Sequence, residues 1–147
     1  MIYKANQKII HGEKCTADDE QFLMDFWRLL SDNIIEWQEV LNKTLTKKAL
    51  RENYIVALAI TISAFGKLGR YFYEHRDENL ELYLSKLRSI DWLRTNEAWV
   101  GRTIRQNGKV LNSEEAISLT CSLIKKSIGI SLTKEERQKE KMMLEKK

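Results

Sequence analysis

The stretch that decides the fold is Tyr54–Tyr73, which reads YIVALAITISAFGKLGRYFY. Its large apolar residues recur every three to four positions, which is the period of one face of an α-helix. The same spacing extends back to Leu50 and is carried by Tyr54, Leu58, Ile62, Phe65 and Phe72. We therefore expect a central core helix that begins at Thr46 and runs to about Tyr73.

Two glycines near the end of this stretch, Gly66 and Gly69, indicate close packing. A glycine lets another helix approach because no Cβ stands in the way. A phosphate-binding loop would need more glycines and a preceding strand. The core should combine residues of this stretch with apolar residues of other segments. The residues expected to be mostly buried are Phe26, Trp27, Leu58, Ile62, Phe65, Trp92, Trp99 and Ile124.

Working outward, capping and stop signals predict the other elements. We expect a short helix over residues 2–10 that ends at Gly12 and a second from Thr16 with a break near 31–33. Further helices should run from Asp77 or Asn79 to Leu87, from Ser113 to Gly129, and as an exposed terminal helix over 133–147. The Asn107-Gly108 pair favours a tight turn and predicts a small β-hairpin over 102–111. The expected fold is mainly all-α, a bundle of about six helices with one β-hairpin.

Composition fits a single helical domain over residues 1–147. The 147 residues are 43% hydrophobic and include six glycines and no proline. No apolar run approaches the roughly 18–20 residues that cross a bilayer, and no signal peptide is evident, so we expect a cytoplasmic protein without membrane contact. Cys15 and Cys121 lie outside any metal or redox motif and are expected to be ordinary thiols.

Charge is unevenly distributed along the chain. Residues 13–39 contain eight acids and two bases, a net charge of −6, whereas the whole chain carries +4, so the remainder carries +10. A basic surface of this kind can bind a polyanion, or the two regions can pair internally or across a dimer. The composition leaves both possibilities open.

No catalytic or metal site emerges from the sequence. His11 and His75 are the only histidines, and neither has a nucleophile or a paired carboxylate at a spacing that implies chemistry. We therefore expect no enzyme activity, no metal and no cofactor.

The Trp-rich block that begins at Ile90, together with the residues that follow it, resembles a known family. Its distinctive residues, in order, are Asp91, Trp92, Arg94, Asn96, Trp99, Gly101 and Arg102, then Asn107-Gly108, Ile124-Lys125-Lys126, Gly129, Leu132-Thr133 and Glu135-Glu136. Their order and spacing resemble the C-terminal region of the DndB family of DNA sulfur modification proteins. Upstream, Ile2-Tyr3-Lys4-Ala5, Phe26-Trp27 and Ile34-Ile35-Glu36-Trp37 are also similar, so the resemblance spans nearly the whole chain.

The resemblance implies a bacterial DNA-binding repressor of the genes that place phosphorothioate linkages in DNA. Family members begin with a larger region carrying an Asp-Gly-Gln-His-Arg signature, which this sequence lacks, so we expect the C-terminal helical part of a longer protein or a truncated member. Leu93 stands where relatives are expected to have Ser, which weakens any hydroxyl role there. The motif residues Asp91, Trp92, Arg94, Asn96, Trp99 and Gly101 are expected to be structural.

The residues expected to contact DNA are Arg102, Arg105 and Lys109 of the hairpin, together with Lys125 and Lys126. Such contacts would be electrostatic, because arginine and lysine neutralise phosphates. Two alternatives stay open. Arg102 could instead pair with Asp91 or Glu97 to brace the Trp-rich block, or the helices could form a scaffold without DNA contact, packed against an N-terminal region of the same protein or a second copy.

Overall fold

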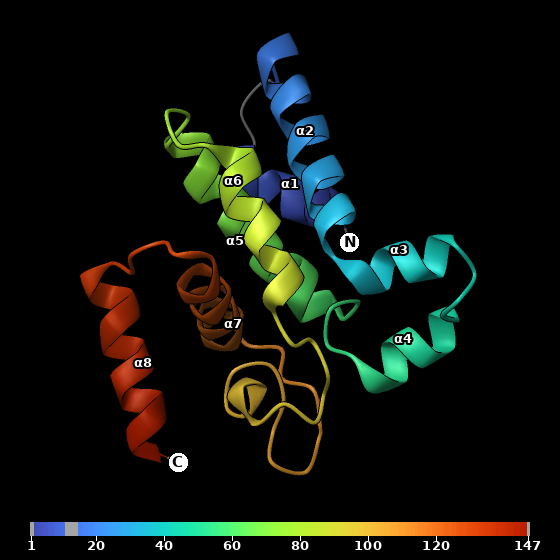
Figure 1. The fold of residues 1–147 in the computed structure, drawn as a ribbon. Helices are drawn as coiled ribbons and strands as arrows, with labels where there is room; N and C mark the ends of the chain where they lie inside the picture. The colour runs from blue at the N-terminus through green and yellow to red at the C-terminus, as the bar shows by residue number, and fades with distance from the viewer. Residues whose placement is uncertain (1, 11–14, 147) are drawn as a thin grey trace.

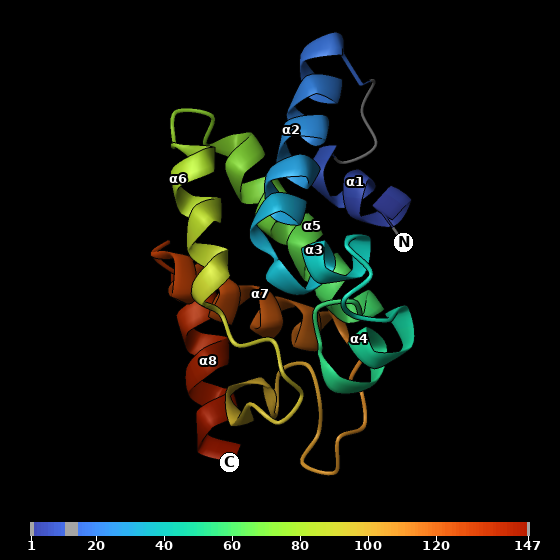
Figure 2. The same ribbon diagram turned by 45° about the vertical axis from the view of Figure 1, so that its right-hand side comes forward.

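The computed structural model describes residues 2–10 and 15–146, which form helices joined by loops (Figures 1 and 2). The described residues form eight α-helices: α1 (Ile2–Ile10), α2 (Ala17–Asn33), α3 (Ile35–Leu41), α4 (Lys47–Asn53), α5 (Ala59–Glu74), α6 (Leu80–Ser85), α7 (Glu114–Ile128) and α8 (Lys134–Lys146). Two 3-10 helices, η1 (Lys86–Ser89) and η2 (Glu97–Trp99), lie in the connection between α6 and α7.

The helix boundaries follow the capping signals of the sequence. Thr16 and Asp19 form a capping box at the start of α2, and the Ser113 side chain accepts from an amide in the first turn of α7. Gly129 ends α7 in the left-handed conformation, with φ 89°. The break expected near residues 31–33 is confirmed, because α2 ends at Asn33 and Ile34 is extended. The stop expected at Gly12 lies outside the described residues.

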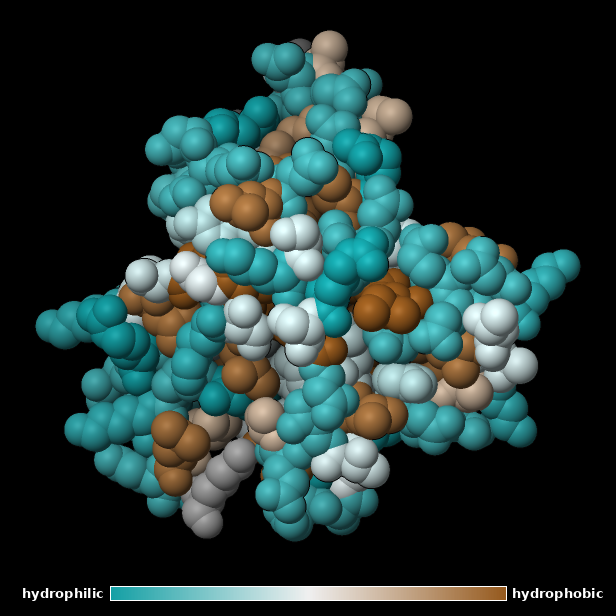
Figure 3. Space-filling view, in the orientation of Figure 1, coloured by the Kyte–Doolittle hydropathy of each residue, from teal (hydrophilic) through white to brown (hydrophobic). Residues whose placement is uncertain are grey.

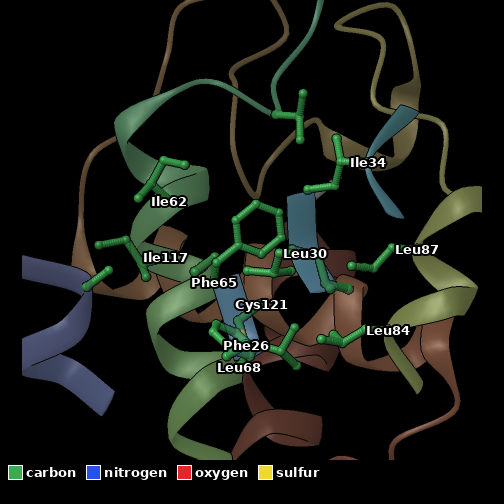
Figure 4. Packing of buried hydrophobic residues seen from close by; sticks show 14 of the residues in the cluster. Phe26, Leu30, Ile34, Ile62, Phe65, Leu68, Leu84, Leu87, Ile117 and Cys121 are labelled. Carbon is green, nitrogen blue, oxygen red and sulfur yellow. The ribbon is translucent and has the colours of Figure 1, made fainter. Parts of the chain in front are cut away.

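Helix α5 is the centre of the fold. It packs against α1 on one side and α7 on the other, while α2 packs on α6 and α3. Figure 4 shows the core between these elements, where Phe26 and Leu30 of α2 lie near Phe65 and Leu68 of α5. Of the residues expected in the core, Trp27 and Leu58 are half-buried and the other six are buried.

The glycines of α5 allow α1 to pack closely, as the sequence indicated. A Cβ at Gly69 would lie 2.6 Å from Ile9 Cδ1 and 3.0 Å from Phe26 Cε2. A Cβ at Gly66 would lie 3.1 Å from the backbone of Ala5. A Cβ at Gly69 would force Ile9 to shift, and one at Gly66 would crowd the backbone of Ala5, so the absence of these atoms lets α1 pack closely on α5.

The single helix expected over residues 46–73 is wrong: α4 ends at Asn53 and α5 begins at Ala59. The intervening backbone bonds to the Trp-rich block instead of continuing the helix. The Ile55 amide donates to the Trp92 carbonyl (2.8 Å), and the Asn53 carbonyl accepts from the Arg94 amide (2.9 Å). These contacts span about forty residues and therefore leave no trace in the local helical period.

The predicted bundle of about six helices with a β-hairpin is also wrong. The described residues contain eight α-helices and no strand, and within 102–111 there is one isolated bridge, between Ile104 and Val110. The amides of Arg102, Thr103 and Ile104 all point back to the Trp99 carbonyl, at 3.1, 2.9 and 3.3 Å. The chain therefore coils where the first strand of a hairpin would have to be extended.

The C-terminal helix α8 docks on α7 mainly through buried charge. Most of its side chains are exposed, but Glu140 and Met143 are buried. Glu140 forms an ion pair with Arg102, in which Nη2 lies 2.8 Å from Oε2, and Lys126 Nζ lies 3.3 Å from the same oxygen. Burial acts to raise the pKa of Glu140, but hydrogen bonds and positive charge from Arg102 and Lys126 outweigh it and hold that pKa below its ordinary value.

We predict that Gly69→Ala destabilises the protein by about 1–3 kcal/mol, because the new methyl group overpacks the contact with Ile9. In an unconstrained helix the same change would stabilise by up to about 1 kcal/mol. Urea unfolding measures whether Gly69→Ala lowers or raises the free energy of unfolding. Trimming the partner with Ile9→Val should recover part of the loss, and a more stable Gly69→Ala protein would contradict the close packing.

We predict that α8 undocks in acid. Because the pKa of Glu140 is lowered in the folded state, its contribution is complete above the ordinary glutamate value of 4.5 and is lost as pH falls through the lowered pKa. In an NMR titration, the amide chemical shifts of α8 should move to values typical of an unfolded chain in this acid range. Glu140→Gln should show those values already at pH 7, since Arg102 then lacks its counter-charge.

The matched control is Glu145→Gln, which removes an exposed carboxylate from the same helix. Its α8 signals should follow the wild type. An α8 that stays docked in Glu140→Gln would show that the buried ion pair does not hold this helix.

Candidate nucleic-acid interface

Arg102, the first cation expected on the DNA surface, lies inside the protein. It is 5% exposed, and its guanidinium donates to Glu140 and to the Leu119 carbonyl, the latter at 3.0 Å. The sequence alternative of a bracing ion pair named Asp91 or Glu97 as the partner, whereas the structure shows Glu140 of α8. Arg102 is thus positioned to hold α8 on the body of the protein.

Lys125 and Lys126, at the end of α7, are also engaged with α8. Lys125 is buried, and its Nζ lies 2.9 Å from Glu136 Oε2 and 5.3 Å from the centre of the Tyr71 ring. Lys126 is exposed but pairs with Glu140. Three of the five expected cations therefore have acidic partners within the fold.

Arg105 and Lys109 remain on the surface and lie together on one tight turn. The Arg105 amide donates to the Lys109 carbonyl (2.8 Å), and the Gly108 amide donates to the Arg105 carbonyl (2.8 Å). Gly108 has φ 85°, and the Asn107 side chain accepts from the Lys109 amide, so the chain turns at the Asn-Gly pair, but this is not the hairpin turn that was predicted, because it joins no strands. The turn projects from the lower end of the molecule (Figure 1), where the surface is mainly hydrophilic (Figure 3).

No ion-pair partner is found for Arg105 or Lys109 within residues 2–10 and 15–146. We call the segment of residues 105–109 the basic turn. It is the part of the expected DNA surface that remains available to a ligand.

The motif residues of the Trp-rich block form its internal framework. The Trp92 and Trp99 rings stack at 5.5 Å between centroids, and Trp92 meets Phe65 of α5 edge-on at 5.9 Å. Trp99 Nε1 donates to the Asp91 carbonyl (2.8 Å), and the Asn96 side-chain amide donates to the same oxygen (2.9 Å). These contacts fix the path of the loop against the helices.

Arg94 and Gly101 complete the framework. The Arg94 guanidinium donates to the carbonyls of Arg51 and Tyr54 at the end of α4, and Gly101 has φ 87°, where glycine is favoured. Leu93, at the position where Ser was expected, forms an isolated bridge with Tyr54. A backbone bridge needs no hydroxyl.

The sequence analysis missed two features of this end of the molecule. One is Glu140, which forms an ion pair with Arg102. The two residues are 38 positions apart, so no local sequence pattern indicates this pair. The other is a group of cations on and beside α4. Residues 40–51 contain four basic and no acidic side chains. This charge pattern was not used as evidence for a surface site, because residues from Thr46 onward were expected to form a core helix.

Of the histidine and cysteine side chains that the structure describes, His75 is engaged, Cys121 is buried and Cys15 is exposed. His75 Nδ1 lies 2.7 Å from the Tyr71 carbonyl, and its ring stacks on Tyr71. Burial raises the pKa of the Cys121 thiol to about 11, while Cys15 is exposed, and both cysteines are free. His11 lies outside the described residues. Within those that are described, no cluster of His, Cys, Asp and Glu could hold a metal ion.

A groove of about 1100 Å³ lies between α1, α5, α7 and α8. Its lining mixes signs: Lys67 and Lys125 stand beside Glu114 and Glu136. With both charges present, the groove does not have the single-sign field that attracts a polyanion. The basic turn remains the better candidate.

Comparison with known proteins shows the family of the chain. No curated protein and no solved structure matches it. Among the helices that the structure describes, none is long and apolar enough to cross a membrane. The family described as DndB, DNA-sulfur modification-associated, matches residues 1–131, which include every helix from α1 to α7 and the Trp-rich block. The chain therefore belongs to the DndB family and is associated with DNA sulfur modification.

Proposed function

We propose that this chain is a non-catalytic, DNA-binding part of a transcriptional regulator of DNA phosphorothioate modification. Membership of the DndB family supports the link to sulfur modification of DNA. The observation that carries the DNA contact is the basic turn, on which Arg105 and Lys109 are both exposed. A projecting pair of cations can reach phosphates along a duplex.

The contact is electrostatic. Arginine binds two phosphate oxygens at once through its planar donors, and lysine acts as a point charge. The start of α7 is unsuited to phosphate, because Glu114 and Glu115 place negative charge at the end that would otherwise attract anions. Binding through the basic turn should therefore depend on salt and little on sequence.

The non-catalytic role is supported by the state of the reactive groups. A thiol with a pKa of about 11 is protonated at neutral pH and is a poor nucleophile, and Cys121 is also shielded from solvent. His75 has one ring nitrogen at the Tyr71 carbonyl and one face against the Tyr71 ring. Neither residue has a partner geometry suited to general acid–base catalysis.

The second candidate function is a protein-interaction scaffold. One observation favours it: the outer face of α2 carries Asp18, Glu20 and Asp32 exposed and Asp25 half-buried, with Arg28 as the one base. This face could meet a basic surface of a second copy or of an N-terminal region of the same protein. Solution mass at two salt concentrations tests for a second copy, since an assembly held by these charges weakens as salt is raised.

We predict that the double variant Arg105→Ala/Lys109→Ala weakens binding to duplexes of different sequence by a similar factor. The slope of log affinity against log salt should fall by about one to two units, because about two phosphates are no longer neutralised. Fluorescence anisotropy with two unrelated duplexes measures both effects.

The control is Lys139→Ala/Lys141→Ala on α8, which removes the same charge from exposed side chains elsewhere. It should keep the wild-type slope. Equal affinity and slope for wild type and the Arg105/Lys109 variant would rule out the basic turn as a DNA contact.

A further inference from the structure

A second group of cations lies on and beside α4. Lys43, Lys47, Lys48 and Arg51 are all exposed, and we call them the α4 cluster. No acidic residue occurs between positions 40 and 51, so the cluster carries four positive charges along a short length of chain. This concentration of positive charge differs from α2, whose charges are mostly negative, and from α8, which mixes acids and bases.

The fold directs these charges into solvent. Leu50 is 7% exposed and is the buried residue of α4. Lys47, Lys48 and Arg51 are spaced i, i+1 and i+4, which confines them to an arc of about 100° on the helix. The three side chains thus form one continuous basic face on a helix whose other side is fixed to the protein.

Few internal partners neutralise the cluster. Lys48 Nζ lies 4.0 Å from Glu52 in an exposed i, i+4 pair, which is a weak interaction. Across residues 2–10 and 15–146, no ion pair is found for Lys43, Lys47 or Arg51. This contrasts with Arg102, Lys125 and Lys126, which are held by acids of α8.

The cluster is fixed to the same loop that carries the basic turn. Arg94 caps the C-terminal end of α4, and backbone hydrogen bonds join Asn53 to Arg94 and Ile55 to Trp92. Figures 1 and 2 both place α4 and the 105–109 turn at the same, lower end of the molecule. The two basic groups are therefore both attached to the loop between α6 and α7.

From this arrangement we infer that the α4 cluster binds the phosphate backbone of duplex DNA together with the basic turn. The inference rests on the proposed function and adds a second contact to it. The ligand is an extended polyanion, because the cations spread over an exposed corner of the molecule and can each take a different phosphate. A helix of seven residues is only about 10 Å long, so its role is to neutralise charge along the duplex.

The test compares Lys47→Ala/Lys48→Ala/Arg51→Ala with Lys134→Ala/Lys139→Ala/Lys141→Ala on α8. Both triple variants remove three exposed positive charges, and alanine favours the helix in each case. Lys43 is left in place because its φ of 62° is unfavourable for alanine. Circular dichroism and thermal melting establish that both variants fold like the wild type.

We predict that the α4 variant lowers the salt slope of duplex binding by about two to three units and that the α8 variant leaves it unchanged. Adding the α4 changes to Arg105→Ala/Lys109→Ala should lower the slope further than either set alone. Anisotropy of one labelled duplex from low to moderate salt measures the slope for the wild type and the four variants.

Two negative results have different meanings. If the wild type binds with a steep salt slope that the Arg105/Lys109 variant reduces, but the α4 variant matches the α8 control, the α4 inference is overturned and the proposed function stands. If the wild type shows no salt-dependent binding to duplex DNA, the proposed DNA contact fails and the α4 inference fails with it.

Discussion

The edge-to-face contact between Phe65 and Trp92 is the interaction on which the end of the molecule that carries the two basic groups depends. Phe65 is fully buried on α5 and also meets Trp37 of α3 at 5.8 Å, so one ring joins three segments. Trp92 in turn stacks on Trp99, and this pair holds the loop between α6 and α7 against the core. Because the same loop caps α4 through Arg94 and carries the basic turn, aromatic packing sets the position of both basic groups.

The cations expected or proposed to contact DNA fall into two sets. Arg102, Lys125 and Lys126 have acidic partners on α8, and the first two are buried. Buried charges need such partners, since an unpaired buried charge is strongly destabilising. The exposed α4 cluster and basic turn have no such requirement, because water solvates them in the free protein. Of the two sets, the second is the one that can exchange water and counterions for phosphate at small cost.

The sequence predicted those features that are local. Helix starts at Thr16, Asn79 and Ser113 follow from single capping side chains, and the close packing at Gly69 follows from a missing Cβ. The single 46–73 helix and the hairpin were wrong because hydrogen bonds from distant residues redirect the backbone at Ile55 and at Trp99. Arg102 was wrongly expected on the surface because its partner, Glu140, is also distant in the sequence.

The charge of a residue can be read from the sequence, but whether that charge is free depends on partners brought together by the fold. Arg105 and Arg102 are three positions apart, yet one is exposed and the other is 5% exposed beside Glu140. The stretch from 40 to 51 was more informative than any single arginine, because its four cations outnumber the one neighbouring acid, Glu52, that pairs with Lys48.

The geometry of the proposed surface also limits what it can recognise. A seven-residue helix and a five-residue turn supply charge at two places, and contacts to phosphate fix register and orientation without distinguishing bases. Direct reading of sequence needs side chains that reach base edges, with bidentate contacts worth about 1–3 kcal/mol each. Within the proposed role, the α4 cluster and the basic turn therefore contribute affinity, and any choice of DNA site must come from base contacts made by other residues.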